Sequence, residues 1–404
     1  MPKQLDVSLL PDLLTGIRNG VDKTISGAVT AAATDWYNKG YDKGYDKGYP
    51  EGYKQALKDI GMNPSSEDDE ETPSWNIEDP YTRIFFDSVN PDGYQQSEHS
   101  AIWPILLTAD IDKGEGEMNT PYCVYGSGDK MIVECADEPS QEISPYKGVF
   151  PTYCLTPGKT YHWTTYDGAK VLKNGSFKAV GRVRWLKIPS IKYPHNMRDL
   201  GCPAKLTTTG KGIKFGRIIR AEHPDNIEVD SAEHIYLRDQ LRLSVQLNLR
   251  NPKDDPARTD LFEKTYSYNI PAYAVALDNN TTYKTAFKNA FLALVKELEA
   301  GRNVFVNCWQ GRDRTGTFCW VVQALCGMKA GYCEAHWELS AFDRCENSKI
   351  WDWEEASRGE LRTFIGKLEK LYGEDAYTQA YRFITEKIGV AKERVEKLKE
   401  IMIG

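Results

Sequence analysis

The sequence lacks the long apolar run that a membrane-spanning helix requires. Nowhere in its 404 residues do about 18 apolar residues follow one another, so we expect no transmembrane segment. The first residues, MPKQLDVSLLPDLL, also lack a basic region followed by a continuous apolar core, so we expect no signal peptide. These absences favour a cytoplasmic protein or one that belongs to a larger assembly.

Metal-binding and disulfide patterns are missing as well. The nine cysteines are irregularly spaced, with no C-x-x-C pair and no Cys/His zinc pattern, and the six histidines are scattered. We therefore expect no metal site, no cofactor and reduced thiols. An excess of positive charge is absent too, because the formal net charge is -7, which argues against nucleic acid as a partner.

Residues 1–62 predict a helical stem with a tandem repeat. Tyrosine recurs at every fourth position from Tyr37 to Tyr53, and glycine does so from Gly40 to Gly52. Positions four apart share a helix face, although each glycine costs about 1 kcal/mol relative to alanine. Close packing against a partner or against further copies of the chain would offset this cost and predicts a homo-oligomer or assembly contact. The alternative is a flexible tether.

The next two segments predict a linker and a β domain. Residues 63–74, NPSSEDDEETPS, have the composition of an acidic, solvated linker. Residues 75–188 contain short apolar runs between turn residues, without a lasting helical period, which favours an all-β sandwich. Within it, LTPGKTYHW (155–163) resembles the L-x-P-G-x-x-Y-x-W corner of fibronectin type III-like domains, where a tyrosine anchors the turn before a core strand.

Residues 189–404 alternate strand and helix patterns. The segments LRLSVQLNLR (241–250) and NVFVN (303–307) predict buried strands. Helices are expected over residues 283–300, 315–328, 333–343, 358–372, 374–388 and 391–402. This alternation predicts an α/β domain with a central, mostly parallel sheet and helices on both faces.

The loop after the strand NVFVN carries the strongest chemical pattern. It begins with Cys308 and ends with Arg314, where a helix opens. A loop at a helix N-terminus directs several N–H groups into one concavity, where the helix dipole also favours an anion, and a thiol there loses its proton readily. Gly311 permits the tight backbone, and Arg314 can hold two phosphoryl oxygens at once. The loop therefore predicts Cys308 as a nucleophile that attacks phosphorus and Arg314 as the phosphate clamp.

The remaining loop residues are assigned to phosphate binding by their position. Thr315 could hydrogen-bond the thiolate and help its departure. Arg312 adds a cation that would favour multiply phosphorylated or inositol-type substrates, although a basic residue there is compatible with phosphotyrosine too. The predicted substrate-binding residues are Trp309, Gln310, Gly311, Arg312, Thr315 and Gly316.

These motifs resemble those of a known family. C-x5-R-[ST]-G after an apolar strand resembles the phosphate-binding loop of protein tyrosine phosphatases. The fuller string C-x-x-G-x-D-R-T-G is similar to the bacterial tyrosine-phosphatase-like group that also acts on phosphoinositides. Further pieces match that group in order, over about residues 195–400: NMRDLG (196–201), GRIIRA (216–221), VQLNLR (245–250), Tyr377 and the closing IGVAKERVEKLK (388–399). The resemblance implies a phosphatase that acts on a phosphorylated protein or a phosphoinositide.

The sequence departs from the family at three places. Cys202 stands where a second glycine is usual. Asn307 stands where histidine is usual, so it can orient the loop by a hydrogen bond but carries no charge. The W-P-D tripeptide that supplies the general acid elsewhere is missing, which leaves Asp313 as the candidate acid, as proposed for relatives with Asp beside the Arg. Asp313 could instead cap the helix, and Asp278 is the second candidate.

Outside the loop, Arg198 and Asp199 are candidate site residues for which a structural ion pair is the favoured interpretation. Arg250 is expected to support the edge of the sheet rather than to contact substrate.

Two functions stay open at this point. The first is a phosphomonoester hydrolase that works through a phosphocysteine, with an accessory β domain. The second is a structural or attachment protein of a phage particle, in the virion, or of another assembly, which carries a phosphatase-like domain of low activity. The stem and Asn307 motivate the second hypothesis.

Overall fold

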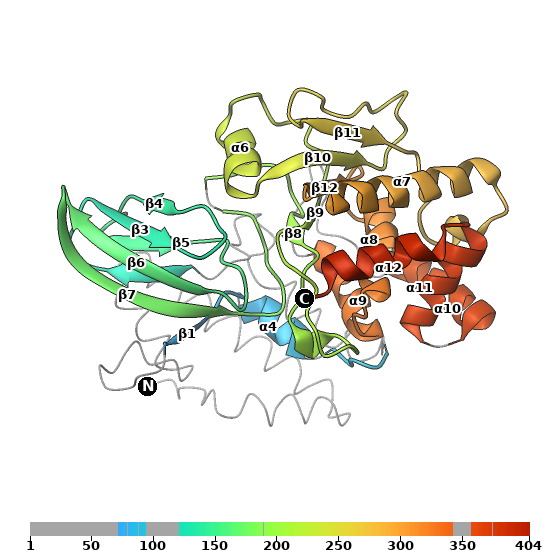
Figure 1. Cartoon of the computed structure of the whole chain (residues 1–404), viewed down its shortest axis with the longest axis horizontal. Helices are drawn as coiled ribbons and strands as arrows, with labels where there is room; N and C mark the ends of the chain where they lie inside the picture. The colour runs from blue at the N-terminus through green and yellow to red at the C-terminus, as the bar shows by residue number, and fades with distance from the viewer. Residues whose placement is uncertain are drawn as a thin grey trace, which may run out of the picture.

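The computed structural model describes residues 72–78, 80–87, 89–93, 121–188, 190–341, 357–373 and 375–404. The predicted stem lies outside these residues, as does the predicted linker apart from its last three residues. The oligomer and tether hypotheses therefore stay predictions. Within the described parts the chain forms a β-rich unit and an α/β unit, drawn on the left and right of Figure 1. No helix in these parts is both long and apolar enough to cross a membrane.

The β-rich unit contains seven strands: β1 (Ser74–Asn76), β2 (Tyr122–Tyr125), β3 (Lys130–Glu134), β4 (Gln141–Ile143), β5 (Val149–Thr152), β6 (Thr160–Asp167) and β7 (Lys170–Val180). Five of them form a sheet in the order β1-β7-β6-β3-β4, and β2 and β5 form a separate antiparallel pair. Strand β1 pairs parallel with β7, whereas the other neighbours are antiparallel. One apolar cluster joins the sheet to the pair, because it contains Val124 of β2, Phe150 of β5 and Phe177 of β7. The region is thus β-rich, while the sandwich assignment stays a prediction.

Tyr161 anchors the turn before its strand, as the LTPGKTYHW segment predicts. The tyrosine is buried, and its hydroxyl accepts a hydrogen bond from the Thr156 backbone amide at 2.8 Å. The same hydroxyl donates to Glu138 Oε2 at 2.7 Å. A side-chain bond to the backbone a few residues upstream is the tyrosine corner of β-sandwich domains. The likeness to fibronectin-type domains beyond this corner stays a prediction.

The α/β unit is built on five strands: β8 (Arg198–Asp199), β9 (Ile218–Ala221), β10 (Leu243–Asn248), β11 (Lys264–Ser267) and β12 (Asn303–Asn307). Their order is β11-β10-β12-β9-β8, and every neighbouring pair is parallel except β8 with β9. The two strands predicted from sequence are therefore confirmed as β10 and β12. Strand β12 lies in the middle, which places its carboxyl end at the centre of one sheet edge.

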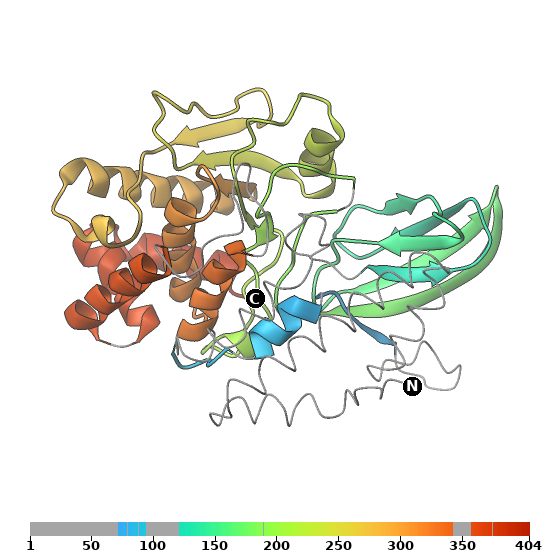
Figure 2. The ribbon, with the colours of Figure 1, turned by 180° about the vertical axis from the view of Figure 1, so that it is seen from behind.

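Helices and short helical turns surround this sheet: α6 (Ala232–Ile235), η4 (Tyr236–Gln240), η5 (Tyr273–Leu277), α7 (Thr281–Glu299), α8 (Asp313–Leu325), α9 (Ala330–Glu338), η6 (Leu339–Ala341), α10 (Ser357–Tyr372), α11 (Ala376–Arg382), η7 (Phe383–Lys387) and α12 (Lys392–Met402). Side chains alternate along β12, so Val304 and Val306 pack with the long helices, whereas Phe305 packs in a second cluster on the other face. That second face is covered by α6, η4 and loops (Figure 2). The prediction of helices on both faces is therefore confirmed only in part, because the long helices all lie on one face and the other face has short helical turns and loops.

The two units meet across a buried polar contact. Arg184 donates to the Cys154 carbonyl of the β-rich unit at 2.8 Å and pairs with Asp199 of β8 at 3.4 Å. The residues just before the α/β unit also pair with it, because the Leu186 amide donates to the Met197 carbonyl at 3.1 Å. The α/β unit is thus attached through fixed backbone contacts on the N-terminal side of residue 189, where the sequence predicts the domain boundary.

Candidate active site

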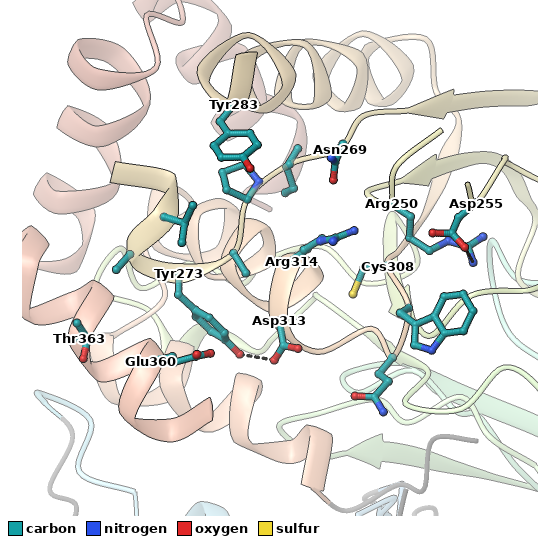
Figure 3. A pocket seen from close by; sticks show the side chains of 17 residues that line it. Arg250, Asp255, Asn269, Tyr273, Tyr283, Cys308, Asp313, Arg314, Glu360 and Thr363 are labelled. Carbon is teal, nitrogen blue, oxygen red and sulfur yellow. Dashed lines mark hydrogen bonds and ion pairs between the residues drawn. The ribbon is translucent and has the colours of Figure 1, made fainter. Parts of the chain in front are cut away.

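Cys308 lies at the carboxyl end of β12, where ligands bind in parallel α/β sheets. The thiol is largely buried and lines a pocket of about 840 Å³. Figure 3 shows Cys308, Asp313 and Arg314 among the side chains that line this pocket. The pocket brings together the start of the loop, the first turn of α8, the segment 269–275 that leads into η5, and the first half of α10.

Two glycines allow the loop and helix α8 to pack closely. Gly311 has φ +66°, and a Cβ built on it would lie 2.2 Å from the Ala221 carbonyl oxygen at the end of β9. A Cβ on Gly316 would lie 2.3 Å from the Trp337 ring. Neither glycine lines the pocket, so both serve the site through backbone geometry.

The loop turns its carbonyl groups away from the pocket. Four successive carbonyl oxygens, those of residues 308–311, each accept a hydrogen bond from a group outside the pocket lining. The donors, in loop order, are Asn307 Nδ2 at 3.2 Å, the His223 backbone amide at 3.1 Å, Asn196 Nδ2 at 3.0 Å and Arg220 Nη2 at 2.6 Å. In a trans peptide the following N–H points opposite to the carbonyl. The amides of residues 309–312 are therefore directed into the pocket, where a bound anion would accept their hydrogen bonds.

Arg314 lines the pocket from the first turn of α8. Its guanidinium has no hydrogen bond or ion pair with any residue that the structure describes. The neighbouring Thr315 Oγ1 is fully buried and likewise has no hydrogen-bond partner within the described residues. An arginine without a partner beside inward-facing amides can take an oxyanion in a bidentate fashion.

Asp313 is held by a tyrosine that the sequence analysis did not single out. The Tyr273 hydroxyl donates to Asp313 Oδ1 at 2.5 Å (Figure 3). Arg312 Nε donates to the same oxygen at 2.6 Å. Burial, and then the charge of Asp313, raise the pKa of Tyr273 well above its ordinary value, so the hydroxyl keeps its proton and remains a donor. Tyr273 has φ +50°, and its amide bonds to Thr317 Oγ1 at 2.9 Å. A non-glycine residue held in this region is typical of functional sites.

Comparison with known proteins agrees with this geometry. Residues 189–404 match the model of the tyrosine phosphatase family, which is more than half of the chain. The chain belongs to the tyrosine phosphatase family. No curated protein matches the chain.

In this phosphatase domain, Asn307 makes the hydrogen bond predicted for it. The residue is fully buried, and its amide donates to the Cys308 carbonyl at 3.2 Å and to Asn248 Oδ1 at 3.4 Å. Its own carbonyl oxygen accepts from Gln246 Nε2 at 2.9 Å. Neutral amides from β10 and β12 thus support the start of the loop.

The cation predicted at the rim of the phosphatase loop points elsewhere. Arg312 does not line the pocket, because its guanidinium is turned toward Asp313. The rim is formed instead by Trp309, whose side chain is 53% exposed. The Trp309 ring lies 4.5 Å from the His223 ring and 5.5 Å from the Arg250 guanidinium. Gln310 also lines the pocket.

Arg250 forms a two-pronged ion pair beside the phosphatase pocket. Its Nη1 and Nη2 lie 2.7 and 2.9 Å from the two Asp225 carboxylate oxygens, and its Nε donates to Asn248 Oδ1 at 3.1 Å. The guanidinium is almost fully buried although it belongs to the lining. These contacts agree with a supporting role at the sheet edge.

Two other predicted residues lie behind the phosphatase loop. Asp199 is buried and makes its ion pair with Arg184, while its oxygens also accept the amides of Gly201 and Gly216 at 2.9 and 2.6 Å. Arg198 donates to the His336 carbonyl at 2.6 Å and to Ser340 Oγ at 3.0 Å. Neither residue lines the pocket, and the partner of Asp199 is Arg184 where the sequence favoured Arg198.

Asp278, the second candidate acid, is exposed at the end of η5 and does not line the phosphatase pocket. The structure therefore does not bring it together with Cys308. Among the carboxylates considered from sequence, Asp313 alone lines the pocket that contains Cys308.

Proposed function

We propose that this chain is a phosphomonoester hydrolase that acts through a phosphocysteine formed on Cys308. The observation that carries the proposal is the outward anchoring of four successive loop carbonyls around a buried thiol. Beside it lies the Arg314 guanidinium, which has no partner within the described parts of the chain. A loop so arranged has donors for the oxygens of a phosphoryl group and a nucleophile below its phosphorus.

The proposed reaction has two steps. The Cys308 thiolate attacks phosphorus in line with the ester oxygen, while the loop amides and Arg314 hold the other oxygens. Asp313 protonates the leaving oxygen, and water then hydrolyses the phosphocysteine with Asp313 as the base. Because Tyr273 and Arg312 both bond to Oδ1 of Asp313, its Oδ2 is the oxygen left for proton transfer.

The lining favours a monophosphorylated aryl ester, such as phosphotyrosine in a protein, over a phosphoinositide. Aromatic and apolar side chains form much of the wall, among them Tyr273, Tyr283 and Trp309. Among the described residues, Arg250 supplies the other guanidinium of the lining, and it is neutralised by Asp225. Asp255 and Glu360 add negative charge to the same lining, which would repel additional phosphates.

Turnover of p-nitrophenyl phosphate tests the proposal. The wild-type protein should hydrolyse it and be inhibited by vanadate, whereas Cys308→Ser should lose activity by at least about a thousandfold because serine is a far weaker nucleophile at neutral pH. Cys135→Ser is a matched control, since this free thiol belongs to the β-rich unit. A wild-type protein with neither turnover nor vanadate inhibition, or a Cys308→Ser variant as active as wild type, would overturn the proposal.

A further inference from the structure

Two motifs of the sequence have no part in the proposed chemistry, yet both reach the phosphate loop from behind. The first, residues 196–201, contributes Asn196, and the second, residues 216–221, contributes Arg220. Their side chains donate to two of the four anchored loop carbonyls, those of Gln310 and Gly311. The other two anchors come from the backbone of His223 and from the residue next to Cys308.

The two captured carbonyls flank the one glycine of the loop. Gly311 is the residue at which rotation of the adjoining peptide planes costs least, because it has no side chain. Asn196 holds the peptide plane before this glycine and Arg220 holds the plane after it. If either plane rotated, the amide of Gly311 or of Arg312 would leave the pocket and a carbonyl oxygen would face the incoming anion.

Asn196 has a conformation that serves this contact. The residue is fully buried, and its φ of +57° lies in the left-handed region that asparagine tolerates better than most residues. Its amide nitrogen donates to the Gln310 carbonyl, while its Oδ1 accepts a hydrogen bond from Arg198. The side chain is therefore fixed from both ends.

The position of Arg220 lowers the stability of the fold. It is almost fully buried and stands directly opposite Arg198 across β8 and β9, so two guanidiniums are buried side by side. Like charges opposite one another in a sheet are destabilising, and burial of a charge adds to the cost. Burial also lowers the pKa of Arg220. An apolar pair at these positions would stabilise the sheet better, so a function of the loop is the better explanation of the arginine.

We propose that Asn196 and Arg220 are positioning residues that clamp the peptide planes on both sides of Gly311 and so hold the phosphate loop in its anion-binding form. The inference rests on the proposed function for the identity of the anion. Neither residue lines the pocket, so both act through the loop backbone rather than on the substrate.

Three variants test the clamp. Asn196→Asp keeps the size, the left-handed backbone and an oxygen for Arg198, but replaces the donor to Gln310 by a second oxygen. Arg220→Met removes the donor to Gly311, and Arg220→Lys keeps a charged donor with less reach. For each protein we would measure the vanadate inhibition constant, kcat and KM with p-nitrophenyl phosphate, and phosphate binding by calorimetry in a Cys308→Ser background.

Matched controls come from the opposite end of β12. Asn303 Nδ2 donates to the Leu241 carbonyl at 3.4 Å, and Arg217 donates to the carbonyls of Leu298 and Gly301 at 3.0 and 3.2 Å. Asn303→Asp and Arg217→Met therefore remove the same kinds of contact far from the loop. Their vanadate inhibition constants should stay within twofold of wild type even where their melting temperatures fall.

We expect Asn196→Asp and Arg220→Met to weaken vanadate and phosphate binding by about tenfold or more and to lower kcat at least as far, since each loses a hydrogen bond that the buried carbonyl needs. Arg220→Lys should recover part of both losses. Folded clamp variants that bind vanadate within twofold of an active wild type would overturn this inference alone. A wild type without turnover or vanadate binding would defeat the proposed function and the inference with it.

Discussion

The two units of the molecule each bury a tyrosine that donates its hydroxyl to a carboxylate, but they use the pair differently. In the β-rich unit, Tyr161 bonds to Glu138 at 2.7 Å and also accepts the Thr156 amide, so the pair closes a turn. In the phosphatase domain, Tyr273 bonds to Asp313 at 2.5 Å, and that carboxylate lines the pocket of the nucleophile. The same local chemistry thus closes a turn in one unit and, in the other, holds the carboxylate that we propose as the general acid.

An arginine accompanies each pair and sharpens the contrast. Each of the three guanidinium nitrogens of Arg184 has a protein partner, because Nε and Nη2 bond to the Cys154 carbonyl and Nη1 pairs with Asp199. Arg314 has no partner among the residues that the structure describes and lines the pocket. An arginine whose guanidinium is bonded to protein groups supports the fold, whereas one that lines a pocket with its donors unused can bind an anion. Substitutions in the two sets should therefore separate stability from activity.

The largest contrast should come from the arginines. Arg314→Lys keeps the charge but removes the two-pronged contact, so kcat/KM for p-nitrophenyl phosphate should fall well over tenfold, with little change in the melting temperature. Arg184→Lys should do the reverse: it loses contacts in the buried seam and should lower the free energy of unfolding by about 2 kcal/mol.

Steady-state kinetics and urea unfolding of both variants check this. If Arg314→Lys retains wild-type kcat/KM, Arg314 is not the clamp. If Arg184→Lys loses activity as strongly as Arg314→Lys while it stays folded, the division between structural and ligand-binding arginines fails.

The loop itself could be predicted from sequence because its chemistry is local. The spacing from Cys308 to Arg314, an apolar strand before it and a helix after it follow one another along the chain, and the position of the anion site depends on these neighbours. The same locality explains why Asn307 was correctly assigned a hydrogen bond to the loop. Strands β10 and β12 were predicted for the same reason, since the alternating apolar residues of 241–250 and the short apolar run within 303–307 are both local patterns.

The support of the loop could not be predicted, because it is brought together by the fold. Asn196 and Arg220 are about 90 to 115 residues away from the carbonyls that they hold, and Tyr273 is 40 residues from Asp313. From sequence alone, the segments that contain Asn196 and Arg220 matched family motifs but had no assigned role, and nothing singled out Tyr273. The orientation of the Arg312 side chain could not be predicted either, because a side chain next to Asp313 in sequence can point into the pocket or toward Asp313.

The second contrast concerns the carboxylates. Asp313→Asn preserves an oxygen for the Tyr273 hydroxyl but cannot transfer a proton, so kcat for alkyl phosphates should fall about a hundredfold or more. The loss should be smaller for p-nitrophenyl phosphate, since a phenolate leaves without protonation. Glu138→Gln likewise keeps an acceptor for Tyr161 and should leave kcat for both substrates within twofold of wild type.

Measuring kcat with one aryl and one alkyl phosphate distinguishes the roles of Asp313. Equal losses on the two substrates would assign Asp313 to structure, though not as the cap of α8, whose N-cap residue is Arg312, and would remove the general acid from the proposed mechanism.

The smallest contrast is that between the tyrosines, and it isolates the hydroxyl groups. Tyr273→Phe removes one of the two hydrogen bonds that fix Asp313 Oδ1, while Arg312 keeps the other, so kcat for alkyl phosphates should fall about threefold to tenfold. Tyr161→Phe leaves the Thr156 amide and Glu138 without their partner and should lower the free energy of unfolding by about 1–3 kcal/mol. Its kcat should remain that of wild type.

The tyrosine pair is the most sensitive test of the comparison, because each substitution deletes a single oxygen atom and alters the packing of the ring least. Thermal or urea unfolding measures the stability of each variant, and kcat on an alkyl phosphate measures its activity. Should Tyr273→Phe lose stability but no activity, Tyr273 would be a turn anchor like Tyr161, and the orientation of Asp313 would then depend on Arg312 alone.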